Sequence, residues 1–165
     1  MIELGQKVKD VVTGVEGIVV VISDHWHGAV RIEMQPPKKK DGTVPEIHVC
    51  DSAQIKVIDK KPIIKGITHP PARFQFGQKA KDPISGYEGT VNGRALFLNG
   101  CVRVALQANQ RDYIKGAARF DAGTWFPEEV IVPTGWTIKP PKTEEPAKRT
   151  GGPALRVTRE PRPSR

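Results

Sequence analysis

The chain has 165 residues, with 26 Lys and Arg against 18 Asp and Glu, and a formal net charge of +8. No apolar run is long enough to span a bilayer and the start lacks a signal-peptide pattern, so a soluble protein made in the cytoplasm, with no membrane partner, is expected. The two cysteines, Cys50 and Cys101, have no metal-ligand spacing, which argues against a disulfide framework or a zinc site.

An internal repeat organises the chain. Residues 4–19 read LGQKVKDVVTGVEGIV and residues 76–91 read FGQKAKDPISGYEGTV, with nine of sixteen positions identical at an offset of 72. The same register continues from residues 28–32 to residues 100–104. A repeat of this kind predicts one small domain that occurs twice in tandem.

The first copy alternates short β-branched runs with turn residues. Gly17 lies inside the second run and recurs as Gly89, which predicts a bulge or sharp bend. A helical turn at residues 51–54 would have Asp51 as its N-cap. Strands are expected at residues 6–12, 16–22, 29–34, 44–49 and 55–58.

The second copy repeats this plan after a linker. The linker, residues 59–73, contains three prolines, but Ile63, Ile64 and Ile67 are too apolar for a free spacer, so part of it should pack on a barrel. A turn at residues 127–129 replaces the helical turn. Strands are expected at residues 78–84, 88–96, 102–107, 123–126 and 130–132.

Four meandering strands, a helical turn and a fifth strand is the order of a small SH3-like barrel. We therefore predict an all-β chain of two tandem SH3-like small β-barrels with an extended Pro/Arg-rich C-terminal tail. The expected boundaries are residues 1–58 for the first barrel, 59–73 for the linker, 74–135 for the second barrel and 136–165 for the tail.

Most of the positive charge lies in the tail. Residues 139–165 contain eight Lys or Arg and three Asp or Glu, a net charge of +5. Residues 142–165 have almost no apolar side chains, so this part of the tail should be disordered alone and order on binding. Its charge predicts a negatively charged partner, with a solvated, solubilising tail as the alternative.

Few residues in the sequence suit catalysis or metal binding. His25 and His27 could form a metal pair, but no third ligand is near, and a surface turn is the favoured interpretation. No serine lies in a nucleophile-elbow context. Cys50 and Cys101 are interpreted as small core residues.

The acidic residues repeat as Asp10 with Glu16 and Asp82 with Glu88. A structural role is favoured over a catalytic one, because Asp10 could hydrogen-bond the turn that follows and Glu16 could pair with Lys7 or Lys9. We expect no enzyme, no cofactor, no metal and no small-molecule substrate.

Basic loops and the tail remain as candidate partner-binding surfaces. Aromatic residues make up 6% of the chain, and Trp26, Tyr87 and Tyr113 are the plausible exposed ones, which weakens a nucleic-acid role. Lys7, Lys9, Lys79 and Lys81 would extend the basic surface of the loops. The candidate partner-binding residues are Lys38, Lys39, Lys40, Arg111, Tyr113, Lys115, Arg119, Trp136, Arg149, Arg156, Arg159 and Arg162.

Both copies of the repeat open with a Gly-Gln-Lys stretch that resembles a small β-barrel domain of tailed-bacteriophage proteins. In that family a similar opening precedes a segment like residues 98–102 and then an aromatic segment, here Trp125 and Phe126. The likeness covers about 110 residues, roughly the two copies without linker and tail. The spacing of Gly5, Val8 and the glycine and valine residues of 14–19 also resembles that of KOW-type barrels.

The phage resemblance implies a non-enzymatic structural component of a virion, either a capsid decoration or a head–tail connector or collar protein. Such a protein would be made in the cytoplasm of the bacterial host. Its partners would be coat or neck subunits, in a symmetric assembly. The KOW resemblance implies the alternative, a nucleic-acid-binding module that uses the basic loops and the tail.

Overall fold

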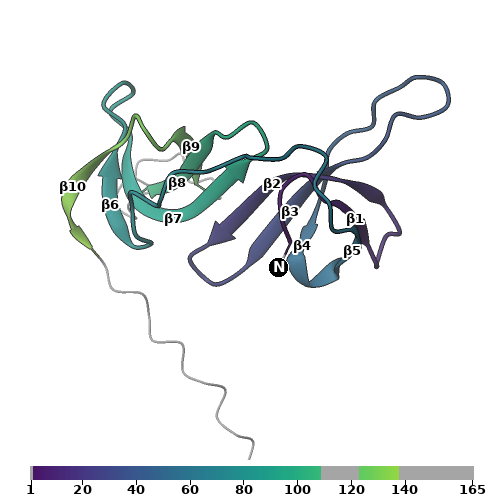
Figure 1. Cartoon of the computed structure of the whole chain (residues 1–165). Helices are drawn as coiled ribbons and strands as arrows, with labels where there is room; N and C mark the ends of the chain where they lie inside the picture. The colour runs from purple at the N-terminus through teal and green to yellow at the C-terminus, as the bar shows by residue number, and fades with distance from the viewer. Residues whose placement is uncertain (1, 109–122, 138–165) are drawn as a thin grey trace, which may run out of the picture.

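The computed structural model describes residues 2–108 and 123–137, which form an all-β structure in two five-stranded halves (Figure 1). The all-β prediction is confirmed. The strands of the first half are β1 (Lys7–Asp10), β2 (Glu16–His25), β3 (Val30–Gln35), β4 (His48–Asp51) and β5 (Ile55–Asp59). The strands of the second half are β6 (Gln78–Lys81), β7 (Glu88–Phe97), β8 (Val102–Ala108), β9 (Thr124–Pro127) and β10 (Val132–Thr137).

The two halves share one strand order. The first half runs β5-β1-β2-β3-β4 and the second β10-β6-β7-β8-β9, all antiparallel, and the pairing of β2 with β7 joins them into one ten-stranded sheet. Among the described strands, no pairing joins β4 to β5 or β9 to β10. The expectation of two separate small barrels is therefore confirmed only as an all-β fold, because the described strands form one continuous sheet without a closed barrel. In the first half, the short turn between β4 and β5 carries the chain to the opposite sheet edge, so neither strand has a second partner among the described strands.

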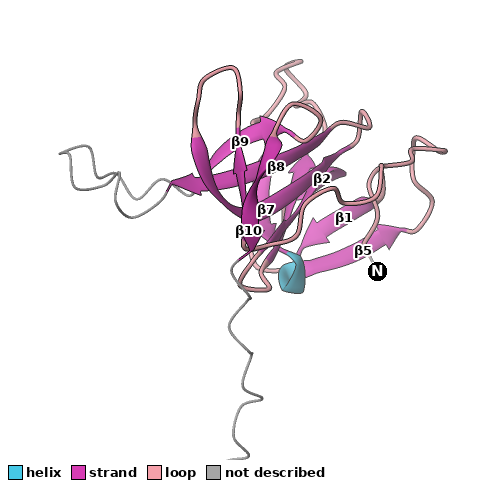
Figure 2. Cartoon of the chain, turned by 90° about the vertical axis from the view of Figure 1, so that its left-hand side faces the viewer, coloured by secondary structure: helices cyan, strands magenta, loops and turns pink. Residues whose placement is uncertain are grey.

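The helical content of the described residues is a single 3-10 turn, η1 (Ser52–Gln54), the cyan element in Figure 2. It lies where the sequence predicts a helical turn, but the Asp51 side chain makes no capping hydrogen bond. One 3-10 turn leaves few orphan amides to cap. No described helix is long and apolar enough to cross a membrane.

Each half has its own core, built from equivalent positions. Val8, Val19, Ile32 and Met34 are at most 1% exposed in the first core. The second core has Ala80, Val91, Val104 and Leu106 at the positions 72 residues later. In the second half, Phe126 occupies the position that Cys50 has in the first core. Its larger side chain fills the volume that is lost because Ala80 stands where the first core has Val8.

The glycines inside β2 and β7, where a bulge or a sharp bend is expected, do not lie at the register shifts of these strands. A Cβ at Gly17 would lie 2.8 Å from the Gln35 carbonyl oxygen, and one at Gly89 would lie 2.5 Å from the Gln107 carbonyl oxygen. The register shifts come later, between Val19 and Val21 and between Val91 and Gly93. Gly17 and Gly89 are therefore required for close approach of neighbouring backbones.

Several strand ends differ from the sequence expectation. β1 ends at Asp10 rather than at residue 12 because Asp10 begins a turn, and β6 is shortened in the same way by Asp82. β4 begins at His48, since the loop around Pro45 is held by a Gln35 side-chain hydrogen bond instead of by a strand ladder.

The two cysteines have different environments. Cys50 is 9% exposed and belongs to the first core, as predicted. Cys101 is exposed, so the prediction that it is a core residue is wrong. Gly100 has a positive φ of 87° in the turn before β8, and Cys101 follows it with its amide bonded to the Asn99 side chain, outside the strand. The alternation of buried residues in β8 therefore begins at Val102, as its predicted bounds imply, and does not include Cys101.

The linker contacts both halves, as expected, but mainly through hydrogen bonds and not through the isoleucines on which the prediction rested. The Ile63 amide donates to the Gly5 carbonyl (3.0 Å), and His69 Nε2 lies 2.9 Å from the Phe97 carbonyl oxygen. Ile67 is half-buried, whereas Ile63 and Ile64 are exposed.

A buried ion pair fixes the end of the linker. Arg94 donates two hydrogen bonds to the Glu128 carboxylate, at 3.1 and 3.2 Å, and Glu128 is 2% exposed. Arg94 also donates to the Pro70 carbonyl, and the Arg73 amide donates to Glu128. The linker is therefore part of the folded structure.

Candidate functional site

The seam between the halves has an internal two-fold symmetry. Ser23 lies opposite Ala95, which is its own repeat equivalent at the offset of 72, so the symmetry axis passes between them. The two residues are 5% and 4% exposed. The register on either side is Val21↔Phe97, Ile22↔Leu96, Asp24↔Arg94 and His25↔Gly93.

Hydrogen bonds beyond this ladder obey the same symmetry. The Trp26 amide donates to the Asn92 carbonyl (2.9 Å), and the Leu98 amide donates to the Val20 carbonyl (2.8 Å). Leu98 is the equivalent of Trp26, and Asn92 is the equivalent of Val20. The seam is thus isologous, the geometry of a two-fold dimer within one chain.

A hollow, the seam groove, lies over this axis. Two arginines at equivalent repeat positions, Arg31 and Arg103, line it from opposite halves. The Arg103 guanidinium lies 5.3 Å from the centroid of the Phe97 ring, and Arg31 Nε lies 3.9 Å from Asp51 Oδ1. The residues that line the seam groove are Ser23, His25, Arg31, Glu33, Val49, Ala95, Phe97, Arg103 and Trp125.

His25 forms part of the wall of the seam groove. Its ring meets Trp125 edge to face at a centroid distance of 6.1 Å. Burial lowers the pKa of His25, and the positive charge of Arg31 lowers it further. His25 is therefore neutral at neutral pH, and the positive charge of the groove comes from its arginines. Arg103, beside the Phe97 ring, suits a carboxylate or phosphate group of a partner, whereas Arg31 is already paired with Asp51.

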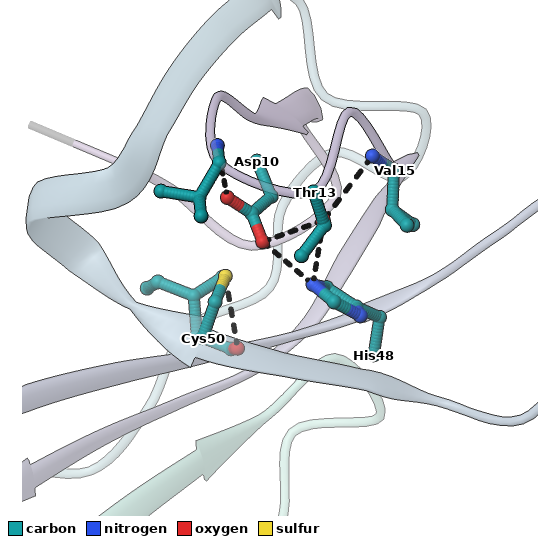
Figure 3. Close-up of polar contacts among 7 residues, drawn as sticks. Asp10, Thr13, Val15, His48 and Cys50 are labelled. Atoms are coloured by element: carbon teal, nitrogen blue, oxygen red, sulfur yellow. Dashed lines mark hydrogen bonds and ion pairs between the residues drawn. The ribbon is translucent and has the colours of Figure 1, made fainter.

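A second cluster lies where the turn after β1 meets β4 (Figure 3). Asp10, which is 1% exposed, accepts hydrogen bonds from the Val12 amide (2.8 Å) and the Thr13 hydroxyl (2.7 Å). His48 Nε2 lies 2.8 Å from Asp10 Oδ2. The bond from His48, then those from Thr13 and Val12, lower the pKa of Asp10 to about 2.

Cys50 completes this group, the Asp10 cluster, which consists of Asp10, His48 and Cys50. Its Sγ, the Asp10 carboxylate oxygen and a His48 ring nitrogen all lie within 4.8 Å of one another. The thiol lies 3.9 Å from the Ile32 carbonyl oxygen. Burial raises the pKa of Cys50, and Asp10 and Asp51 raise it further, so the thiol is protonated at neutral pH and unsuited to nucleophilic attack.

The contacts predicted for Asp10 and Glu16 are present. Asp10 caps its own turn, and Asp82 does the same by accepting from the Ile84 amide and the Ser85 hydroxyl. Glu16 forms ion pairs with both Lys7 (3.3 Å) and Lys9 (3.7 Å). These pairs are exposed and contribute little to stability.

The loop between β3 and β4, the lysine loop (residues 36–47), projects from the first half (upper right in Figure 1). It presents the predicted partner-binding residues Lys38, Lys39 and Lys40, all exposed. A turn orders its tip, since the Lys39 amide donates to the Thr43 carbonyl (2.8 Å). Three positive charges thus stand clear of the sheet.

The other predicted partner-binding residues are placed only in part. Trp136 lies on β10. Two of the aromatics expected to be exposed, Trp26 and Tyr87, are half-buried, and the Tyr87 hydroxyl donates to the Leu106 carbonyl. Arg111, Tyr113, Lys115, Arg119, Arg149, Arg156, Arg159 and Arg162 lie outside the described residues.

Sequence reasoning did not single out the seam groove or the Asp10 cluster. A signal existed for the groove, because Arg31 and Arg103 occupy the same place in the matched segments. A signal also existed for His48 and Cys50, whose spacing of two puts both on one face of a strand. Their partner Asp10 lies 38 residues away from His48, beyond any local pattern.

The two histidines considered as a metal pair, His25 and His27, contact different aromatic rings. His25 faces Trp125, and His27 stacks on Trp26 in the turn after β2. That turn is closed by a hydrogen bond from the Gly28 amide to the His25 carbonyl, in agreement with the expected surface turn.

Comparison of the chain with family models, with curated protein sequences and with solved structures gave no match. The function is therefore argued from the residues and surfaces described above.

Proposed function

We propose that this chain is a non-enzymatic structural component of a tailed-phage virion, either a capsid decoration or a head–tail connector or collar protein. In this proposal each half is a curled, incompletely closed SH3-like barrel. Neighbouring coat or neck subunits bind to the exposed barrel surfaces and to the C-terminal tail. The resemblance of residues 4–19 and 76–91 to a phage domain is one support for this proposal.

The observation that carries the proposal is an apolar tip repeated in both halves. Val12, in the turn after β1, is 70% exposed, and its equivalent Ile84, in the turn after β6, is 83% exposed. A single exposed apolar side chain needs no explanation, but the same position exposed twice favours a contact with a partner. Val11 beside the first tip is 59% exposed.

Free sheet edges add to this surface. β4 pairs with β3 alone among the described strands, and Val49 on it is 52% exposed. Val44 and Ile47, in the preceding loop, are 67% and 48% exposed. An uncovered apolar edge promotes aggregation unless a partner adds to it, and an extended segment of a neighbouring subunit could do so.

The first test is protein composition and copy number in purified particles from the source of this sequence. A fixed copy number relative to the major coat protein supports the proposal, with many copies indicating decoration and about a dozen indicating a connector or collar. Absence of the chain from washed particles would contradict it.

A variant pair tests the apolar tips. Val12→Ser combined with Ile84→Ser should leave the fold intact and reduce incorporation into particles, because both residues are exposed. Ile63→Ser is the matched control, because Ile63 is likewise an exposed apolar residue, at 64%, but lies in the linker. Equal incorporation of both variants would argue against the tips as the contact.

The lysine loop favours a second candidate function, a KOW-like module that binds nucleic acid. Its three charges would contact phosphates, so affinity would fall steeply with salt. Replacing Lys38, Lys39 and Lys40 by alanine should weaken binding. The slope of the logarithm of the binding constant against the logarithm of the salt concentration should fall in magnitude by about one per lost phosphate contact. Binding that is insensitive to salt or to these replacements would exclude this function.

A further inference from the structure

The Asp10 cluster brings together three different metal-ligand chemistries. A carboxylate, an imidazole and a thiol, from Asp10, His48 and Cys50, have donor atoms within 4.8 Å of one another. Asp10 ends β1, whereas His48 and Cys50 lie on β4, so the fold brings the donors together from two strands (Figure 3). Oxygen, nitrogen and sulfur together form a donor set typical of zinc.

The second half provides an internal comparison. Among the described residues, the side chains that hydrogen-bond within the equivalent turn are those of Asp82 and Ser85. The strand positions opposite that turn are Thr124 and Phe126, which pair with Leu106 and Val104 as His48 and Cys50 pair with their equivalents. Because the turn forms without an imidazole or a thiol, holding the turn does not account for His48 and Cys50.

The cluster is also open to solvent on one side. The His48 side chain is 23% exposed, while Asp10 is 1% and Cys50 9% exposed. A metal ion can therefore enter past the imidazole. The Thr13 hydroxyl, 3.4 Å from His48 Nε2, or a water molecule is placed to complete four ligands.

We propose that Asp10, His48 and Cys50 bind a divalent zinc-type metal ion. On binding, the Cys50 thiol releases its proton to solvent and the thiolate donates to the metal, with no change of oxidation state. The hydrogen bond between His48 and Asp10 is replaced by two metal–ligand bonds. The metal then ties the turn after β1 to the free-edge strand β4, so binding stabilises the folded first half. This inference does not depend on the proposed function.

The experiment uses the full chain carrying Cys101→Ser, so that Cys50 is its one thiol. Titration with Co²⁺ under reducing, oxygen-free conditions should give the thiolate-to-cobalt absorption band at one ion per chain, and Zn²⁺ should displace it. Adding Zn²⁺ should also raise the melting temperature and slow the reaction of Cys50 with a thiol reagent.

Variants identify the ligands. In the Cys101→Ser chain, Cys50→Ser should abolish the thiolate band. His48→Ala should weaken metal binding at least about tenfold, since loss of a ligand costs no less than loss of an outer-shell partner. Asp82→Asn is the matched control, because it alters the equivalent turn of the second half and should leave metal affinity unchanged.

Two results would overturn the proposal. One is the absence of a thiolate band together with unchanged Cys50 reactivity in excess Zn²⁺. The other is equal metal affinity in the His48→Ala variant and its parent. If Cys50→Ser does not fold, the reactivity of Cys50 in the parent chain with and without Zn²⁺ still decides, because it requires no substitution in the cluster.

Discussion

Replacing Gly17 or Gly89 by alanine should destabilise the protein, although both lie in strands, where alanine is ordinarily tolerated better than glycine. A Cβ at Gly89 would lie 2.5 Å from the Gln107 carbonyl oxygen and 2.8 Å from its carbon. At Gly17 the corresponding distances to Gln35 are 2.8 and 2.9 Å. The obstructing atoms are backbone, so no side-chain rotation relieves the contact.

The magnitude follows from these distances. Restoring an ordinary contact of 3.4 Å requires the strands to separate by roughly 0.9 Å at Gly89 and roughly 0.6 Å at Gly17. Overpacking of this kind costs about 1–3 kcal/mol, offset by about 0.4–1 kcal/mol from the reduced entropy of the unfolded chain. We expect a net loss of about 1 kcal/mol for Gly17→Ala and about 2 kcal/mol for Gly89→Ala.

Urea denaturation followed by circular dichroism measures both free energies of unfolding. Gly14→Asn is the control, because a Cβ there meets nothing within 4 Å and asparagine tolerates the positive φ of 77°. The control should change stability by less than about 1 kcal/mol. If Gly89→Ala is as stable as the parent, or less affected than Gly17→Ala, close backbone approach is not what these glycines serve.

Two further predictions concern buried charges. The folded-state pKa of Asp10, about 2, is below its ordinary value of 3.8, so its stabilisation is present above that value and is lost as the pH falls toward 2. Asp10→Asn should lower stability at neutral pH and flatten the decline between these values, as measured by urea denaturation across a pH series. An unchanged decline would contradict this assignment. Glu128→Ala should cost about 3 kcal/mol, because it leaves Arg94 mostly buried without its carboxylate. Equilibrium denaturation measures this loss, with Glu129→Ala, at an exposed neighbour, as the control.

Much of the local structure could be predicted from the sequence because each half repeats it. The aspartate turns, the order of the strands and the helical turn follow from residues close together in the chain. The errors arose where distant contacts decide. Gly17 is predicted at a bulge or sharp bend, but the nearby carbonyl of Gln35 explains its lack of a side chain. Cys101 was expected in the core because its repeat partner Ala29 was assigned to a strand, and both precede their strands.

The candidate sites were harder to predict than the fold. The lysine loop was found as a run of charge, and the structure places it clear of the sheet. The Asp10 cluster is not predicted from the sequence, because His48 and Cys50 form a candidate site only together with an aspartate on another strand. The seam groove is not predicted from the sequence, because its two arginines come from different copies and line one groove only when the copies pair.

The sequence by itself determined that two similar all-β units would form, with glycine and aspartate at matching turns and alternating apolar residues in each core. The tertiary structure alone decided that β2 and β7 pair about a two-fold axis between Ser23 and Ala95. The physical reason is that strand edges join through backbone hydrogen bonds, which every residue except proline offers alike. A local pattern therefore specifies the strands and their buried faces, whereas the joining of two edges depends on the shape of the folded halves.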